Sequence, residues 1–134
     1  MASFSDSIIE EFRANGGQVT RPYPDSTLVL VTLRGAKSGR EMTLPIEYLL
    51  DDGRLVVFGT KSGAPDNPAW VYNLRADPDV TVEFGSETFP ATAREITGEE
   101  RDRLWATLVS NKPRFAEYTE KTDRVFPAFE LARS

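Results

Sequence analysis

The sequence predicts an α+β protein built on a closed antiparallel β-barrel. Short turns join most of its expected strands, and short turns connect antiparallel neighbours. A parallel crossover between strands would need a helix of about a dozen residues, and the sequence offers none between its early strands. The strand expected at 28–33 is apolar without alternation, which indicates burial on both faces and favours a closed barrel over an open sheet.

The first element is a helix at about 5–16. Polar residues at 5–7 can cap its start, and the glycine pair at 16–17 can end it. Its apolar face is a short stripe of Ile8, Ile9 and Phe12. This stripe can pack on the barrel or touch a membrane surface, and its shortness favours packing on the barrel.

Three strands are expected next, at 28–33, 43–50 and 55–58. Pro45 is a local irregularity in the second strand. The turn Asp51-Asp52-Gly53 joins the second and third strands as a hairpin. A short helix then follows, with Asn67 as its cap and Pro68 at its first position.

The second half of the chain adds a hairpin, helices and a closing strand. Val80 to Phe84 alternates apolar and polar residues, as a strand with one wet face does, and a strand at 89–93 follows the turn at 85–86. Thr97 and Glu100 form a capping box for a longer helix, which Pro113 ends. The remaining elements are a short helical stretch at 115–118 and a last strand at 126–131.

Composition limits what this chain can do. Its 134 residues predict a single domain over 1–134. The absence of cysteine and histidine excludes disulfides, thiolate metal sites and a Ser-His-Asp triad. A net charge of −5 argues against a general nucleic-acid binder. The acidic residues form no ligand-like cluster, so no metal site is expected. No visible secretory signal or membrane-span run is present, which predicts a cytoplasmic protein.

Two polar loops are the candidate binding elements. The segment 34–40 carries three positive charges, two glycines, a serine and no acid, which suits a phosphate or carboxylate but equally a solvated hairpin loop. The segment 60–63 is a second small loop with one lysine. The two loops follow neighbouring strands and could face each other across a pocket. Without cysteine or histidine, an enzyme of this composition needs a cofactor to carry its chemistry.

Three further residues are candidates, although pattern alone favours a packing or structural role for them. Trp70 has helical spacing with Leu74, and Asn73 can cap or turn a helix end. Tyr118 forms an aromatic pair with Phe115 and can supply one hydroxyl to a pocket wall.

These loops carry a resemblance to a known family. Residues 30–40 read LVTLRGAKSGR, followed by Pro45, and resemble the TTRGRKSGR…P segment of the deazaflavin-dependent nitroreductase family. Residues 60–74 read TKSGAPDNPAWVYNL and resemble its SKGGAPxxPAWYxNL segment. The match continues at 76–82, 93–95 and 122–127, and it covers the chain from about residue 15 onward.

The resemblance implies a split β-barrel related to the FMN-binding split barrels. It implies the deazaflavin coenzyme F420, whose reduced form passes a hydride to quinones, nitroaromatics or other electron-poor acceptors. The positions that match family segments at the cofactor's acidic tail are Lys37, Ser38, Gly39, Arg40, Thr60, Lys61, Ser62 and Gly63. Those that match the segment beside the ring are Pro68, Ala69, Trp70 and Asn73.

The chain departs from the family pattern in three places, one of which is Val71, where the family usually has a tyrosine. Family arginines are replaced by Ala36 and Met42, which predicts weaker cofactor binding. Where nitro-active members have three tyrosines, this chain has Lys112, Phe115 and Tyr118, which predicts quinone over nitroimidazole reduction with Tyr118 as the catalytic candidate.

The resemblance therefore predicts an F420H2-dependent oxidoreductase that passes a hydride to a quinone or another electron-poor acceptor. The alternatives are a non-catalytic carrier of F420 or a lipophilic ligand, and an FMN-binding protein on the same barrel. A homodimer, and contact with a membrane through the N-terminal helix, are left open by the sequence.

Overall fold

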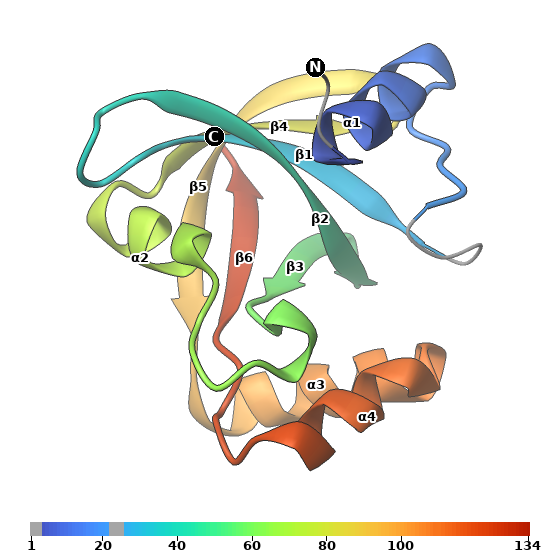
Figure 1. Ribbon diagram of the computed structural model, residues 1–134, viewed down its shortest axis with the longest axis vertical. Coiled ribbons are helices and arrows are strands. Elements are labelled where there is room, and N and C mark those ends of the chain that lie inside the picture. The colour runs from blue at the N-terminus through green and yellow to red at the C-terminus, as the bar shows by residue number, and fades with distance from the viewer. Residues whose placement is uncertain (1–3, 22–25) are drawn as a thin grey trace.

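The computed structural model of this chain describes residues 4–21 and 26–134, and it forms a closed antiparallel barrel with helices outside it (Figure 1). The expected fold is confirmed, and in the described residues the strand order is β1-β2-β3-β6-β5-β4. The strands are β1 (Leu28–Arg34), β2 (Glu41–Asp51), β3 (Arg54–Phe58), β4 (Asp79–Phe84), β5 (Glu87–Ile96) and β6 (Ala128–Arg133). The helices are α1 (Phe4–Ala14), η1 (Lys61–Gly63), α2 (Ala69–Ala76), α3 (Gly98–Asn111), η2 (Pro113–Phe115) and α4 (Ala116–Lys121). None of the helices in the described ranges is long and apolar enough to cross a membrane.

Strand β2 changes partner along its length. Residues 41–47 pair with β1, and residues 48–51 pair with β3. Pro45 lies opposite Leu30 in the β1–β2 pairing. The strand therefore continues through Pro45, where the sequence predicts a local irregularity. The middle of β2 therefore lies where the barrel passes from one partner strand to the next.

The core has an interior and an exterior part. Val29, Val31 and Val57 are buried in the barrel interior, whereas Leu30 contacts Phe12 of α1 on the outside. Both faces of β1 are thus covered, which explains its unbroken apolar sequence. On another side, Leu104 of α3 packs with the outer residues of β3 and β6.

The apolar stripe of α1 packs on the barrel. Ile8, Ile9 and Phe12 are all buried. The helix begins at Phe4, so the serines and aspartate at 5–7 lie inside it and the predicted cap there is wrong.

The predicted capping box of α3 is also wrong. Thr97 occupies the N-cap position but makes no side-chain cap hydrogen bond. The helix starts at Gly98 with φ +68°, a left-handed entry that does not give the usual capping geometry. Glu100 instead accepts a hydrogen bond from Arg54 at 3.3 Å.

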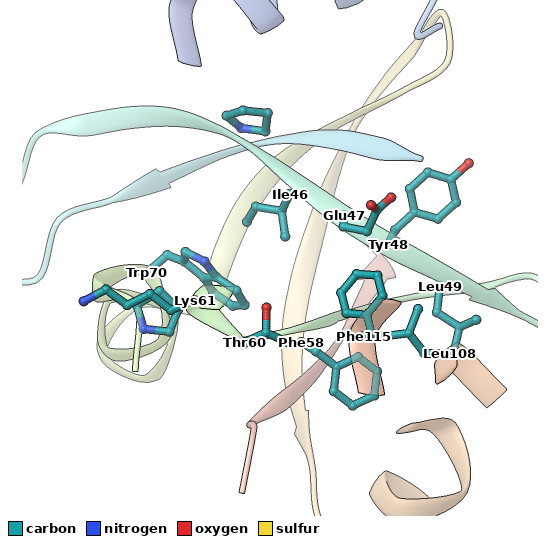
Figure 2. Close-up of a pocket in the computed structure, with 12 residues that line it drawn as sticks. Ile46, Glu47, Tyr48, Leu49, Phe58, Thr60, Lys61, Trp70, Leu108 and Phe115 are labelled. Carbon is teal, nitrogen blue, oxygen red and sulfur yellow. The ribbon is translucent and has the colours of Figure 1, made fainter. Parts of the chain in front are cut away.

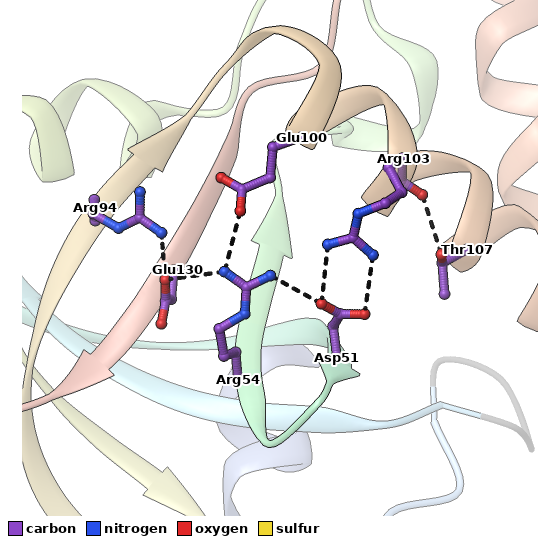
Figure 3. Close-up of polar contacts among 7 residues, drawn as sticks. All are labelled: Asp51, Arg54, Arg94, Glu100, Arg103, Thr107 and Glu130. Atoms are coloured by element: carbon purple, nitrogen blue, oxygen red, sulfur yellow. Dashed lines mark hydrogen bonds and ion pairs between the residues drawn. The ribbon is translucent and has the colours of Figure 1, made fainter.

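An ion-pair network fastens α3 to the barrel (Figure 3). Arg54 of β3 lies 2.9 Å from Asp51, 3.3 Å from Glu100 and 3.6 Å from Glu130. Arg103 of α3 also contacts Asp51, at 3.3 Å. Hydrogen bonds from Arg103 and Arg54 hold the pKa of Asp51 below its ordinary value.

We predict that Asp51→Asn destabilises the fold by about 1 kcal/mol at pH 7, the scale of a few partly exposed ion pairs. Because the pKa of Asp51 is lowered by folding, its contribution is complete above the unfolded-state pKa of about 3.9 and disappears as the pH falls through the lower folded-state value. Urea unfolding of both proteins between pH 7 and pH 3 measures this. A stability difference that stays constant down to the lowest pH would contradict the assignment.

Candidate functional site

A groove runs beneath β2, and its middle is a cavity of about 160 Å³ (Figure 2). In Figure 2, Trp70 and Lys61 lie at one end of this cavity, and Phe58, Phe115 and Leu108 lie toward the other. Its lining residues come from β2, from the β3–η1 segment, from the start of α2 and from the α3–η2 region. They are Pro45, Ile46, Glu47, Tyr48, Leu49, Phe58, Thr60, Lys61, Pro68, Trp70, Leu108 and Phe115.

A second cavity of about 330 Å³ continues the first toward α4. Both cavities are lined by Pro45, Glu47, Thr60 and Phe115. The second adds Ser62, Arg114 and Tyr118, together with Ser5, Ile8 and Leu28.

A third cavity of about 360 Å³ lies at the β1–β2 hairpin. It is lined by Gly35, Ala36, Lys37, Ser38, Met42, Ala69, Tyr72 and Asn73. Pro68 and Trp70 line the middle cavity, and Ala69, which lies between them in the sequence, lines the third. Both cavities therefore border the start of α2, although they share no lining residue. We call the three cavities together the β2 groove.

Helix α2 holds the hairpin end of the β2 groove. The backbone N–H of Ala36 donates to Asn73 Oδ1 at 2.9 Å, so Asn73 fastens the hairpin to α2. Arg34 forms an ion pair with Asp77 at 3.8 Å. Lys37 and Arg40 are exposed, and neither has an ion pair among the residues that the structure describes. This end therefore presents two cations that an anionic ligand could bind.

The η1 turn carries the lysine of the second predicted loop. Lys61 and Ser62 have φ values of +46° and +55°, the left-handed region that such residues rarely adopt. Lys61 Nζ lies 3.0 Å from Asp66 Oδ2, and this bond holds the pKa of Asp66 below its ordinary value. The lysine is thus already paired, and an anionic ligand would compete with Asp66 for it.

The predicted cap of α2 is displaced by one residue. Pro68, not Asn67, is the N-cap residue. Asn67 Oδ1 accepts a hydrogen bond from Arg124 instead, which removes it from the helix start.

At the α4 end, Glu47 organises a partly buried cluster. Glu47 accepts from Arg114 Nη2 at 2.6 Å and from Lys112 Nζ at 2.9 Å, and it also accepts from the backbone N–H of Thr27. The Arg114 guanidinium lies over the Phe115 ring, 4.7 Å from its centroid, and Phe115 meets the Tyr118 ring edge-on at 5.4 Å. Glu47 and Arg114 therefore form a polar part of the wall of the second cavity.

The structure brings most predicted site residues to the β2 groove. Ten line one of its cavities: Lys37, Ser38, Thr60, Lys61, Ser62, Pro68, Ala69, Trp70, Asn73 and Tyr118. Gly39 and Arg40 belong to the hairpin without lining its cavity, and Gly63 faces α4.

The sequence reasoning missed Glu47 and Arg114. Glu47 could have been noticed as an acid in an otherwise mainly apolar strand, but nothing local indicates a partner 67 residues away.

Three comparisons with known proteins agree in what they find. The model of a family described as F420H(2)-dependent quinone reductase matches residues 7–132. A putative F420H(2)-dependent quinone reductase of Mycobacterium tuberculosis is 30% identical over 116 residues, covering 87% of this chain and 95% of that protein. The structure of an F420-H2 dependent reductase (FDR-A) is 40% identical with a TM-score of 0.70, covering 78% of this chain and 92% of the other. A structure described as a domain-swapped dimer is 35% identical with a TM-score of 0.72, covering 92% and 93%.

We predict that Asn73→Leu, which removes the side-chain acceptor of the Ala36 N–H, speeds hydrogen exchange of that amide about fivefold, as expected for the loss of a hydrogen bond worth about 1 kcal/mol. Asn73→Asp keeps a carbonyl-type oxygen at the same place and is the matched control, with exchange close to wild type. Equal exchange in Asn73→Leu and wild type would show that the hairpin does not depend on α2.

Proposed function

Because the chain belongs to the F420H(2)-dependent quinone reductase family, we propose that its β2 groove holds the cofactor and a quinone side by side. In this proposal the cofactor's anionic tail lies at the β1–β2 hairpin and its ring in the middle cavity. The quinone occupies the second cavity, between Arg114 and Tyr118. The observation that supports this best is the series of three cavities along β2. The hairpin cavity has Lys37 in its lining, the middle cavity is mainly aromatic and apolar, and the second cavity combines aromatic residues with Arg114.

The residues present fit coenzyme F420. Its deazaflavin ring is flat, and Trp70, Phe58 and Pro45 offer it apolar walls. Its tail carries a phosphodiester and glutamates. Lys37 and Lys61 line the hairpin and middle cavities, and the exposed Arg40 belongs to the same hairpin as Lys37. A net charge of −5 repels such a tail at long range, so binding depends on these local cations.

The proposed reaction reduces a quinone to a hydroquinone by two electrons. The reduced deazaflavin, when bound, supplies the hydride, and a proton from water completes the hydroquinone. The protein fixes the two rings in the groove and excludes water from the space between them. As the quinone gains the hydride, negative charge grows on its oxygen. In this proposal Arg114 and the Tyr118 hydroxyl stabilise that charge, since both residues line the second cavity.

Glu47 keeps Arg114 in place for this role. Its bond to Arg114 at 2.6 Å and the contact of the guanidinium with the Phe115 ring leave the arginine few alternative rotamers. The ammonium of Lys112 is engaged by Glu47 and Thr27, at 2.9 and 2.6 Å. Since Phe115 and Lys112 offer the cavity no hydroxyl, we propose that quinones are better acceptors than nitroimidazoles.

The proposed function is tested by mixing reduced F420 with the protein and a quinone under anaerobic conditions. Oxidation of the cofactor with matching hydroquinone formation supports it. Binding without turnover identifies a carrier instead, and tight binding of FMN in preference to F420 identifies a flavin protein. A nitroimidazole in place of the quinone tests the acceptor preference in the same assay.

We predict opposite effects on F420 affinity for the two members of the Lys61–Asp66 pair. Lys61→Ala should weaken binding about threefold to thirtyfold at low salt, as loss of one charged contact does. Asp66→Asn should tighten binding about twofold to fivefold, because the lysine is released and a nearby negative charge is removed. Equilibrium titration at two salt concentrations measures both, and both effects should shrink as the Debye length falls from ~30 Å at 0.01 M to ~8 Å at 0.15 M.

Glu99→Gln, in the first turn of α3, is the control for the change in net charge. Its affinity should equal that of wild type. If Asp66→Asn behaves like this control and Lys61→Ala like wild type, Lys61 does not contact the tail.

We also propose a homodimer, on the strength of the related structure described as a domain-swapped dimer. Light scattering of the purified protein tests this. Membrane contact through α1 receives no support, because its apolar stripe is buried against the barrel. A cytoplasmic location stays a prediction from the sequence.

A further inference from the structure

Arg124 lies in the segment between α4 and β6 and binds one loop with its whole guanidinium. Its Nη1 donates to Gly59 O at 2.9 Å, its Nη2 to Thr60 O at 2.8 Å and its Nε to Ala64 O at 3.0 Å. Nη1 also donates to Asn67 Oδ1. All four acceptors belong to the stretch 59–67, which contains η1.

The environment of Arg124 makes these bonds strong. The guanidinium is partly buried, and its flat face lies 4.7 Å from the Phe126 ring centroid. Burial lowers the pKa of Arg124, although an arginine stays charged at neutral pH. Hydrogen bonds from a charged donor to carbonyls in such surroundings are roughly twice as strong as neutral ones.

The loop that Arg124 binds needs external support. Lys61 and Ser62 are left-handed non-glycine residues, and such conformations persist only where the surrounding structure holds them. The turn also meets α4, where a Cβ on Gly63 would come within 2.9 Å of Tyr118 O. The turn therefore contacts both the Arg124 guanidinium and the backbone of α4.

We propose that Arg124 is the positioning residue that holds residues 60–63 in the conformation that binds the cofactor. Arg124 lines none of the three cavities of the β2 groove, so it acts through the loop and not by contact with a ligand. Because the same turn packs on the α4 segment that carries Tyr118, Arg124 also sets the distance between the cofactor and acceptor ends of the groove. This inference rests on the proposed function, in which Lys61 of this turn contacts the cofactor.

The test compares three variants in two measurements. Arg124→Met keeps an apolar stem but removes all donors, and Arg124→Lys keeps the charge but loses the fork that reaches several carbonyls. Arg54→Met is the matched control, since Arg54 also makes several charged contacts but lies in the α3 network outside the groove. The measurements are amide hydrogen exchange across 59–66 in the free protein, and the F420 dissociation constant.

We expect Arg124→Met to exchange faster across 59–66 and to bind F420 at least about tenfold more weakly, the effect of losing one or two charge-assisted hydrogen bonds. Arg124→Lys should lie between Arg124→Met and wild type, and it keeps the test open if Arg124→Met does not fold. Arg54→Met should lower the melting temperature while its F420 dissociation constant stays within about twofold of wild type.

Failure of this inference and failure of the proposed function give different results. Wild-type binding of F420 with unchanged exchange and affinity in both Arg124 variants overturns the inference alone. Faster exchange in these variants with unchanged F420 affinity overturns the assignment of residues 60–63 to the cofactor, and with it the inference. A wild-type protein that binds no F420 overturns the proposed function itself.

Discussion

The change of partner along β2 is the constraint on which the rest of the structure depends. One strand of 11 residues pairs first with β1 and then with β3, and this closes the barrel. Its middle residues, from Pro45 to Tyr48, consequently serve two purposes. They complete the hydrogen-bonded wall of the barrel, and they form the upper side of the groove in which the cofactor is proposed to lie. A shift of β2 by one residue would move every side chain of the strand to the opposite face of the sheet, and it would turn Glu47 away from Arg114.

The groove combines a rigid barrel wall with loops that are held by charged hydrogen bonds. Asn73 fastens the hairpin, Arg124 fastens the η1 turn, and Glu47 fastens Arg114. Each contact is long-range in sequence, so the groove takes shape only when the barrel is complete. This suits an enzyme whose cofactor supplies the reactive chemistry, because the protein's task is to place two rings and the charges around them.

Much of this arrangement could be predicted from the sequence, and the failures have physical reasons. The β-strands followed from apolar patterns, and the two binding loops from charge, glycine content and family resemblance. The predicted side-chain cap at Thr97 is wrong because the next residue, Gly98, has a left-handed backbone. The predicted cap at Asn67 is wrong because its side chain accepts a hydrogen bond from the distant Arg124. Nothing in the local sequence predicts the left-handed backbone of Lys61 and Ser62, because only tertiary contacts stabilise this conformation in residues other than glycine. Glu47 and Arg114 were missed because their contact joins residues 67 positions apart.

The central claim is that the groove beneath β2 binds the cofactor at the hairpin and in the middle cavity, and the quinone at the α4 end. Backbone amide chemical shifts recorded during titration with F420 test this most directly, because every part of the chain reports at once. The account predicts shifts concentrated at 35–40, 60–63 and 68–73, with Leu50, Arg54 and Arg133, which line a separate cavity on the barrel, unaffected. Shifts concentrated around Leu50 and Arg133, with the hairpin and the η1 turn unchanged, would contradict it.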